Sequence, residues 1–457
     1  MPAKRRTWPT ILAGLSALAL LTGCSGQPLT HLPADKISGP DTAWMMLSSA
    51  LVMLMTPALA LFYGGLVRQK NVLSVVMQSF IALGVISLQW LLIGYSLSFA
   101  PTALKIGQYG LIGGLDFAGT NLGRNVLLTP YEPLAPTIPH KLFMIYQMMF
   151  AVITPALISG AFAERMKFKT YLVFIVLWST LVYDPVCHWV WNPDGWLNKV
   201  GSIDFAGGTV VHMTSGITAL LVALMIKPRR GFPREAFVPH NLVLTVFGAG
   251  LLWFGWFGFN GGSALTSGMT AVTAFTSTHA AAAAGAVTWT LWDWLTKDKP
   301  TLLGAASGAV AGLVAITPAS GFVGLWSAIA IGGLAGIVCS VVVTWRAKKG
   351  IDDALDAFGV HGVGGTLGAI LTGVFATNLV NGDNVTLKTS QGIIRDGNSA
   401  KLLTAQFYAV GVTIVYTVVV SYILLKVLDL TMGLRVSTEE EQMGLDLTQH
   451  GESAYNN

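Results

Sequence analysis

The chain has 457 residues, of which 53% are hydrophobic and only 11% are charged, and its mean hydropathy is +0.62. This composition excludes a soluble globular protein and indicates a polytopic membrane protein. The net charge of +5 is scattered over short hydrophilic segments rather than gathered in one patch, so no nucleic-acid partner is expected.

Residues 1–24 have the pattern of a bacterial secretory signal. Basic residues at positions 4–6 precede an apolar run over 11–21, which is too short to span a membrane, and polar residues follow at once. The run ends in Leu-Thr-Gly-Cys, a lipobox pattern that would place a lipid on Cys24 after cleavage. Ordinary cleavage nearby is the alternative. We expect residues 25–41 to form a polar segment on the outer side of the membrane.

Three cysteines are too few and too far apart for a disulfide framework or a zinc site. We expect Cys187 and Cys339 to pack inside helices. Neither a metal nor a cofactor is predicted.

Eleven apolar stretches beyond residue 41 are each long enough to cross about 30 Å of hydrocarbon as a helix. The predicted fold is therefore an all-α polytopic membrane protein with a transmembrane domain over 42–430 and a tail over 431–457. The stretches cover 43–66, 72–99, 142–163, 170–190, 207–226, 240–259, 271–295, 302–317, 321–345, 358–380 and 403–428.

The loops predict the orientation of these helices. With the mature N-terminus outside and eleven crossings, the C-terminus lies in the cytoplasm, and sixteen Lys and Arg fall on cytoplasmic loops against eight outside. This bias agrees with the positive-inside rule. The chain is therefore expected in a bacterial inner membrane.

Two halves of the sequence resemble each other when the chain is divided near Arg234. The first predicted helix ends in Phe-Tyr-Gly-Gly and the sixth in Phe-Asn-Gly-Gly, while the fifth and tenth carry His212 and His361. Five helices per half is an odd number, so the second half must run inverted to the first. We predict two inverted five-helix repeats plus a final helix, with a shared site near the midplane.

His212 and His361 both lie in glycine-flanked motifs, DFAGGTVVH and DAFGVHG. An ionisable group at membrane depth is costly and generally faces a cavity or a bundle interior. Two stacked imidazoles could pass a proton or orient a substrate. The alternative is two separate histidines, each satisfied within the core.

An acidic residue precedes each histidine. Asp204 is expected to cap the helix that carries His212 by accepting N–H groups of its first turn, and its charge could also help a cation at the outer mouth. We expect Asp356 to cap the helix of His361 in the same way, with Asp352 and Asp353 in solvent.

Aromatic residues are dense near the outer helix ends. Most are expected to form the interfacial belt of a membrane protein, but an aromatic cage also holds a small cation without a fixed charge. Tyr146 and Phe150, four residues apart, share one helix face.

Six motifs together resemble the bacterial Amt ammonium transporters of the Amt/MEP/Rh superfamily, in that family's order and from about residue 41 to the end. They are GAFAER (160–165), DFAGGTVVHMTSG (204–216), EAFVPHN (235–241), WFGFNGGS (256–263), DAFGVHG (356–362) and GLDLTQHGESAY (444–455).

The resemblance implies a right-handed bundle of eleven helices, assembled as a homotrimer with one pore per subunit. Residues carried over to matching positions are the pore residues His212, His361 and Trp256; the ammonium site Trp191, Phe150, Ser263 and the supporting Asp204; and the stacked gate Phe150 and Phe259. Tyr146 departs from the phenylalanine common in bacterial relatives, which puts the polarity of the outer vestibule in doubt. A PII signal protein at the cytoplasmic face is the implied partner.

Three other classes of function can be compared with the same residues. An ammonium sensor coupled to PII signalling would use the same site, although the short tail leaves no room for an appended signalling domain. A membrane enzyme would need a motif such as GxSxG or HExxH beside the histidines, and neither is present. A potassium channel would need a filter sequence like TVGYG, which is also absent.

Overall fold

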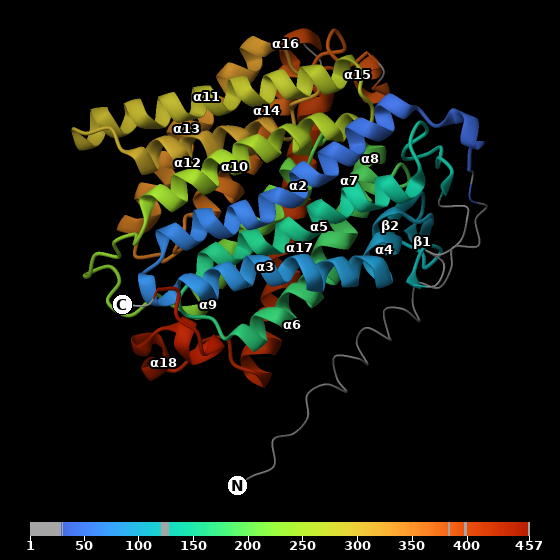
Figure 1. Cartoon of the computed structure of the whole chain (residues 1–457). Helices are drawn as coiled ribbons and strands as arrows, with labels where there is room; N and C mark the ends of the chain where they lie inside the picture. The colour runs from blue at the N-terminus through green and yellow to red at the C-terminus, as the bar shows by residue number, and fades with distance from the viewer. Residues whose placement is uncertain (1–28, 30, 120–127, 383, 397–399, 456–457) are drawn as a thin grey trace.

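The computed structural model describes residues 29, 31–119, 128–382, 384–396 and 400–455. Within them the chain forms a bundle of long helices that run between two ends (Figure 1). Cys24 and the expected signal segment lie outside the described residues, so they stay predictions.

Nine helical segments among the described residues are long and apolar enough to cross a membrane. Each follows from an uninterrupted apolar stretch, because a helix satisfies all of its backbone groups internally where no water is available. They are Gly39–Leu66 (α2), Gln69–Phe99 (with α3, Val72–Gln89, and α4, Tyr95–Phe99), His140–Phe162 (α5), Phe168–Trp191 (with α6, Phe168–Trp178, and α7, Asp184–Trp191), Gly208–Ile226 (with α9, Thr214–Ile226), Leu242–Ala264 (with α10, Leu242–Gly261), Leu325–Lys348 (α13), Phe358–Phe375 (with α14, Val363–Phe375) and Lys401–Thr431 (α17).

Two more helices complete the bundle. α12 (Leu302–Ile316) is apolar but has only 15 residues, and α11 (Met269–Lys297) has 29 residues with several threonines and a histidine among them. Both pack within the bundle, α11 against α10, α12 and α13. Short helices lie in the connections: α8 (Trp196–Val200), α15 (Val385–Thr389), α16 (Ile393–Asp396) and α18 (Thr438–Met443).

The expectation of an all-α chain is wrong in one place. Strands β1 (Thr102–Ile106) and β2 (Tyr109–Gly113) form an antiparallel hairpin in the connection between α4 and α5. Its turn contains Gly107 at φ +60°, a conformation that glycine adopts without strain. We name the end of the bundle that carries this hairpin the hairpin side, and the opposite end, where α18 packs, the tail side.

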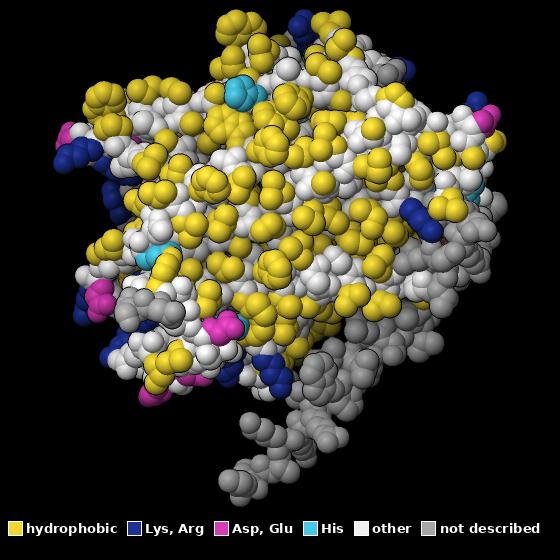
Figure 2. Space-filling model, in the orientation of Figure 1, with side chains coloured by type: hydrophobic (Ala, Val, Ile, Leu, Met, Phe, Trp, Pro, Cys, Tyr) yellow, Lys and Arg dark blue, Asp and Glu magenta, His cyan; other side chains and the backbone are white. Residues whose placement is uncertain are grey.

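The surface agrees with a membrane-spanning bundle. Hydrophobic side chains cover the middle of the visible face, and Lys and Arg gather at its left end, which is the tail side (Figure 2). Cys187 and Cys339 are buried and unpaired, as expected of packing residues.

The C-terminal tail is folded rather than loose. Ser437 and Glu440 form a reciprocal capping box at the start of α18. Farther on, the Asp446 carboxylate accepts hydrogen bonds from the backbone N–H groups of Leu73 and Ser74, at 3.0 and 2.8 Å. The tail therefore caps the first turn of α3 from a distant part of the sequence.

Candidate functional site

His212 and His361 come from two helices that run in opposite directions. Each histidine lies in a π-helical turn at the start of its segment, η7 (Gly208–Met213) before α9 and η9 (Phe358–Gly362) before α14. The extra residue in such a turn is a common feature of functional sites. An aspartate precedes each turn, Asp204 before η7 and Asp353 before η9, each eight residues before its histidine, so the two segments are arranged alike.

The two imidazole rings contact each other inside the bundle. The distance between their Nδ1 atoms is 3.2 Å, and the rings stack with centroids 5.2 Å apart at 23°. One Nδ1 must donate and the other accept, so the two rings hold opposite tautomers when both are neutral. The His212 Nε2 atom has no hydrogen-bond partner among the described residues. The alternative of two separate core histidines is therefore wrong, because the two rings contact each other.

A narrow cavity of about 10 Å³ runs beside the histidines. That volume is at the lower limit for one water molecule and excludes a hydrated ion. Trp256 and Phe259 stack on His212, and the Trp256 indole N–H donates to Thr317 Oγ1 at 2.9 Å. Apart from the two histidines the lining is apolar or aromatic: Met55, Leu59, Phe62, Ile153, Leu157, Leu252, Trp256, Phe259 and Val310.

Two phenyl rings separate this narrow cavity from the hairpin side. Phe259 lines the narrow cavity, Phe150 lines a wider cavity beyond it, and their ring centroids are 4.3 Å apart. Both rings are buried. A molecule moving between the two cavities must displace them.

The hairpin-side cavity has a volume of about 130 Å³ and brings together Phe150, Trp191 and Ser263. The rings of Phe150 and Trp191 meet edge to face, with centroids 5.9 Å apart. The Ser263 hydroxyl donates to the backbone oxygen of Phe259 at 2.9 Å, so its oxygen keeps a lone pair available as an acceptor even when the Tyr146 hydroxyl donates to it. Aromatic rings and a hydroxyl acceptor in one cavity suit a small cation with N–H groups.

Tyr146 does not line this cavity. Its hydroxyl lies 2.9 Å from the backbone oxygen of Phe259 and 3.1 Å from Ser263 Oγ. The extra hydroxyl is therefore directed at the backbone of α10 and at the far side of Ser263, and the polarity of the cavity is set by Ser263 and Gln147.

Asp204 lies beside this cavity and begins the segment of His212. Its carboxylate accepts four backbone N–H groups, from Gly207, Gly208, Thr209 and Val210, at 2.7–3.2 Å. Its backbone oxygen accepts the Trp191 indole N–H at 2.9 Å. Burial raises the pKa of the Asp204 carboxyl, and the four N–H donors oppose that rise. The capping geometry expected of Asp204 is present.

The corresponding expectation for Asp356 is wrong. The carboxylate that caps η9 belongs to Asp353, which accepts N–H groups of Ala357 and Phe358 at 3.1 and 2.8 Å. The Asp356 carboxylate instead forms an ion pair with Arg346. Asp353 lies eight residues before His361, as Asp204 lies eight before His212, and this equal spacing was the sequence signal for the cap.

Asp352 and Asp353 are also buried rather than solvated, each 1% exposed. Burial raises the pKa of Asp353 to about 6, although Arg346 and the capped N–H groups oppose this. Burial alone would raise the pKa of Asp352 too, but the guanidinium groups of Arg229 and Arg165 hold it below its ordinary value.

A third cavity, of about 210 Å³, opens on the tail side of the histidines. His361 lines both this cavity and the narrow one, so the pair stands between two wider spaces. Phe237 lies on its wall, with the guanidinium groups of Arg229 and Arg68 4.2 and 4.7 Å from its ring centroid.

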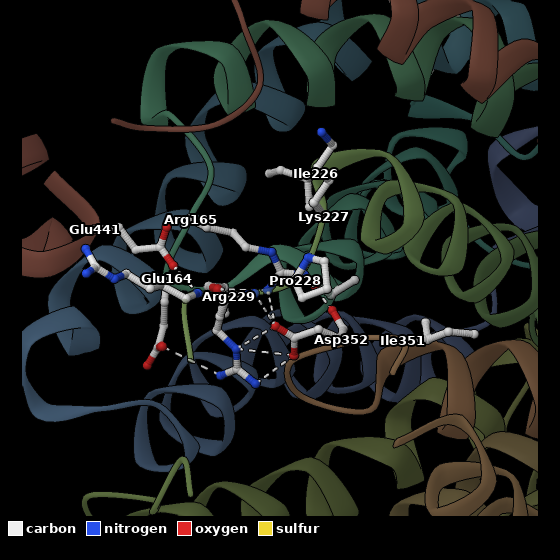
Figure 3. A network of polar contacts seen from close by, with 12 residues as sticks. Glu164, Arg165, Ile226, Lys227, Pro228, Arg229, Ile351, Asp352 and Glu441 are labelled. Carbon is white, nitrogen blue, oxygen red and sulfur yellow. Dashed lines mark hydrogen bonds and ion pairs between the residues drawn. The ribbon is translucent and has the colours of Figure 1, made fainter. Parts of the chain in front are cut away.

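Buried ion pairs join several segments around this tail-side cavity (Figure 3). Asp352 pairs with Arg229 at 2.8 Å and Arg165 at 3.4 Å, and Glu164 pairs with Arg68 at 2.6 Å. Burial lowers the pKa of Arg165 to about 10, so it stays charged at neutral pH. A buried charge needs such partners because desolvation is costly. The network fixes the ends of α2, α5 and α9 against the segment that precedes His361.

The tail extends this network. The Glu441 carboxylate accepts the backbone N–H of Arg230 at 2.8 Å and pairs with Arg435 at 2.7 Å. Arg435 in turn donates to the backbone oxygens of Ile226 and Pro228. The tail is thus connected through the end of α9 to Asp352, in the segment that precedes His361.

Comparison with known proteins agrees with this arrangement. The pattern of the Ammonium Transporter Family matches residues 43–455. The chain is 49% identical to an ammonium transporter of Bacillus subtilis over 416 residues, 91% of this chain and 98% of that protein. Its fold is similar to the crystal structure of Saccharomyces cerevisiae Mep2, with a TM-score of 0.82, 39% identity and 92% of each chain covered. A solved structure of a sensor Amt protein is also similar, with a TM-score of 0.78, 29% identity, and 90% of this chain and 98% of that chain covered. The chain therefore belongs to the Ammonium Transporter Family, whose members are multi-pass membrane transporters rather than enzymes.

Proposed function

We propose that this protein recruits ammonium on the hairpin side, removes a proton and conducts ammonia through the narrow cavity. The observation that carries the proposal is the order of the spaces: an aromatic cavity, two phenyl rings in contact and tilted by 44°, a passage too narrow for a hydrated ion, and a wider exit. Of these spaces, only the narrow passage is lined by both His212 and His361.

Recruitment relies on Phe150, Trp191 and Ser263. The ring faces attract a cation electrostatically, and the Ser263 oxygen accepts one of its N–H groups. Asp204 supports the site indirectly, because its backbone oxygen holds the Trp191 indole. Its buried negative charge also favours a cation in the adjacent cavity.

A comparison of free energies favours deprotonation before passage. An unpaired ion in a dry interior costs several kcal/mol or more even after relaxation. Removing a proton from ammonium, whose pKa is about two units above neutral, costs roughly 3 kcal/mol. Ammonia then passes beside the histidines, where ring nitrogens offer both a donor and an acceptor. Potassium has a similar size but cannot lose its charge, so it is excluded.

The histidine pair offers the released proton a route of its own. Two imidazoles joined through Nδ1 can exchange tautomers when one proton arrives and another leaves. The same contacts also serve to orient ammonia. This geometry is compatible with transport of ammonia alone and with transport of ammonia together with a separately carried proton.

We further propose the following topology. Eleven helices, the nine apolar spans together with α11 and α12, cross a bacterial inner membrane, with residues 25–41 outside, 42–430 as the transport domain and 431–457 in the cytoplasm. The gathering of basic residues at the tail side supports a cytoplasmic tail (Figure 2). The shared arrangement of the two histidine segments supports the inverted repeats.

Family membership supports a homotrimer and a PII signal protein at the tail side. The packed tail offers an ordered surface for such a partner. An ammonium sensor coupled to PII signalling is the second candidate, favoured by the similarity to a sensor Amt protein.

Uptake of labelled methylammonium separates the two candidates. In cells lacking other ammonium transporters, we expect the wild-type chain to restore uptake, and Trp191→Ala with Ser263→Ala to reduce it. A chain that reaches the membrane in normal amounts, binds a PII protein and shows no uptake is a sensor, and the transport proposal then fails.

A further inference from the structure

Asp184 is a carboxyl group inside the bundle that belongs to none of the three cavities. It is the first residue of α7, it is fully buried, and it lies within a membrane-spanning segment. None of the ion pairs between described residues includes it. A buried ionised carboxylate without a counter-ion is costly, and an ionisable group at membrane depth generally has a function.

Its polar partner is Gln89, at the end of α3. The Gln89 amide nitrogen Nε2 donates to Asp184 Oδ2 at 2.8 Å and to Thr180 Oγ1 at 3.1 Å. Two atoms of the pair have no hydrogen-bond partner among the described residues, Asp184 Oδ1 and Gln89 Oε1. Both are acceptors when Asp184 is ionised, so neither can satisfy the other.

One proton removes this conflict. A protonated Asp184 carries a hydroxyl donor for Gln89 Oε1, while its other oxygen keeps the hydrogen bond from Gln89 Nε2. The acid and the amide then satisfy each other in both directions. The bound proton also neutralises the Asp184 carboxylate, so the pair needs no counter-ion.

Gly94 shows that the two groups share one small space. A β-carbon placed on Gly94 would lie 2.8 Å from both the nitrogen and the oxygen of the Gln89 amide, and 3.1 Å from Asp184 Oδ2. The whole polar edge of the amide therefore faces the same backbone position as the carboxyl. Glycine leaves the room that the pair occupies.

Both partners adjoin π-helical turns. η3 (Trp90–Gly94) follows Gln89 directly, and η6 (Ser179–Tyr183) directly precedes Asp184. Two such turns in neighbouring segments move the side chains away from ordinary helix positions and toward each other. Paired distortions of this kind in otherwise regular helices indicate a functional position.

The titratable groups around Asp184 supply no positive charge. Tyr183 and Cys187 lie on its own segment and Tyr416 comes from α17. Phenols and thiols are ordinarily neutral at pH 7. His188, four residues along the helix, is directed at the backbone oxygen of Ser98 and at Thr102.

We propose that Asp184 is a proton-binding site, separate from the ammonia passage, and that it holds its proton at neutral pH in a reciprocal pair with Gln89. The pair joins α3 to α7. Trp191 ends α7, seven residues or two turns beyond Asp184, so the pair also fixes the position of this ring at the hairpin-side cavity. This last consequence rests on the proposed function, whereas the protonation itself does not.

Infrared difference spectroscopy of the full chain in liposomes tests the proton directly. We expect a carbonyl stretch of a protonated carboxylic acid at pH 7 that is present in the wild-type protein, shifted in heavy water, and missing from Asp184→Asn. The matched control is Asp194→Asn, since Asp194 is solvent-exposed and paired with Lys199, and we expect no protonated-acid band to be lost in this variant. Absence of a band that depends on Asp184 would overturn the proposal. So would loss of that band on adding sodium, because a metal ion rather than a proton would then occupy the pair.

Variants at the pair separate its role from simple packing. Asp184→Asn keeps a donor and an acceptor toward Gln89, so we expect ammonium uptake close to that of the wild type. Asp184→Leu removes the link from Gln89 to α7 and leaves the Gln89 amide only its hydrogen bond to Thr180. We expect a higher KM with a smaller change in maximal rate, because Trp191 moves. Equal loss of uptake in both variants, at equal protein levels, would show that the carboxylate charge itself is required and would contradict the proposal. The infrared result does not depend on transport, so its failure and that of the proposed function are distinguishable.

Discussion

Gly216 lies so close to Gly362 that a β-carbon on Gly216 would fall 2.0 Å from the Gly362 backbone nitrogen. Gly365 makes the inverse contact, since a β-carbon there would fall 2.9 Å from Cβ of His212. Each glycine follows the histidine of its own half by four residues. These two approaches hold the histidine segments together and support the proposed inverted repeat.

Gly216→Ala is expected to force these segments apart. The neighbouring atoms are backbone and cannot rotate away, so we expect a destabilisation of about 1–3 kcal/mol and loss of ammonium uptake. Gly411→Ala on α17 is the control, because a β-carbon there meets nothing within 4 Å. Thermal unfolding in detergent and uptake in liposomes measure both effects. A Gly216→Ala protein as stable and active as Gly411→Ala would contradict the close packing.

Asp204→Ala should leave four buried N–H groups without their acceptor. Each unsatisfied donor costs about 1–3 kcal/mol, although water entering the site reduces the total. Asp204→Asn keeps one acceptor oxygen, so its loss of stability should be smaller. Denaturation midpoints for the two variants, with uptake measured alongside, check this order. If alanine is tolerated better than asparagine, the capping role is wrong.

Asp353 should give stability a specific dependence on pH. Its pKa is raised from the ordinary 3.8 to about 6, so the folded state binds this proton more tightly than the unfolded state. The stability it contributes is fully present below pH 4 and is lost as the pH rises through about 6. We expect the melting temperature of Asp353→Asn to fall less over this range than that of the wild type. Asp194→Asn, on the hairpin side and paired with Lys199, serves as the control and should keep the wild-type slope; a slope that follows Asp194 instead would contradict the assignment.

Asp446→Ala is expected to release the tail. The variant removes the acceptor for the N–H groups of Leu73 and Ser74, which ends the capping of α3. Limited proteolysis from the tail side should then cut the tail faster than in the wild type. Glu439→Gln, at a fully exposed position in the same tail, should leave the cutting rate unchanged. Equal protection of the Asp446→Ala tail would show that other contacts hold it.

Most of the helices could be predicted from the sequence because a membrane-spanning helix requires a long, uninterrupted run of apolar residues. The sequence predicted the histidine pair because two ionisable residues at membrane depth in similar motifs are rare. It could not predict the π-helical turns of η3 and η6, since an extra residue in a turn changes no hydrophobicity. Nor could it predict that Arg165 and Arg229 from distant loops enclose Asp352, so that acid was expected in solvent.

The misplaced cap has a simple cause. Asp356 is the first residue of the DAFGVHG motif, and this position suggested the cap. The residue that caps is instead the one at the right distance from the histidine. Asp353 corresponds to Asp204 by the same eight-residue spacing. The β-hairpin was missed because two short strands within a long polar connection bury little surface and leave a weak pattern.

The most direct test of the central claim compares ammonium with potassium in liposomes that contain the purified protein. Under the same inward potential, we expect uptake of ammonium nitrogen with no flux of labelled potassium or rubidium. Potassium cannot give up its charge, so it must stop before the two phenyl rings. Potassium flux at a rate comparable to that of ammonium would show that intact cations pass beside His212 and His361, and would contradict the account.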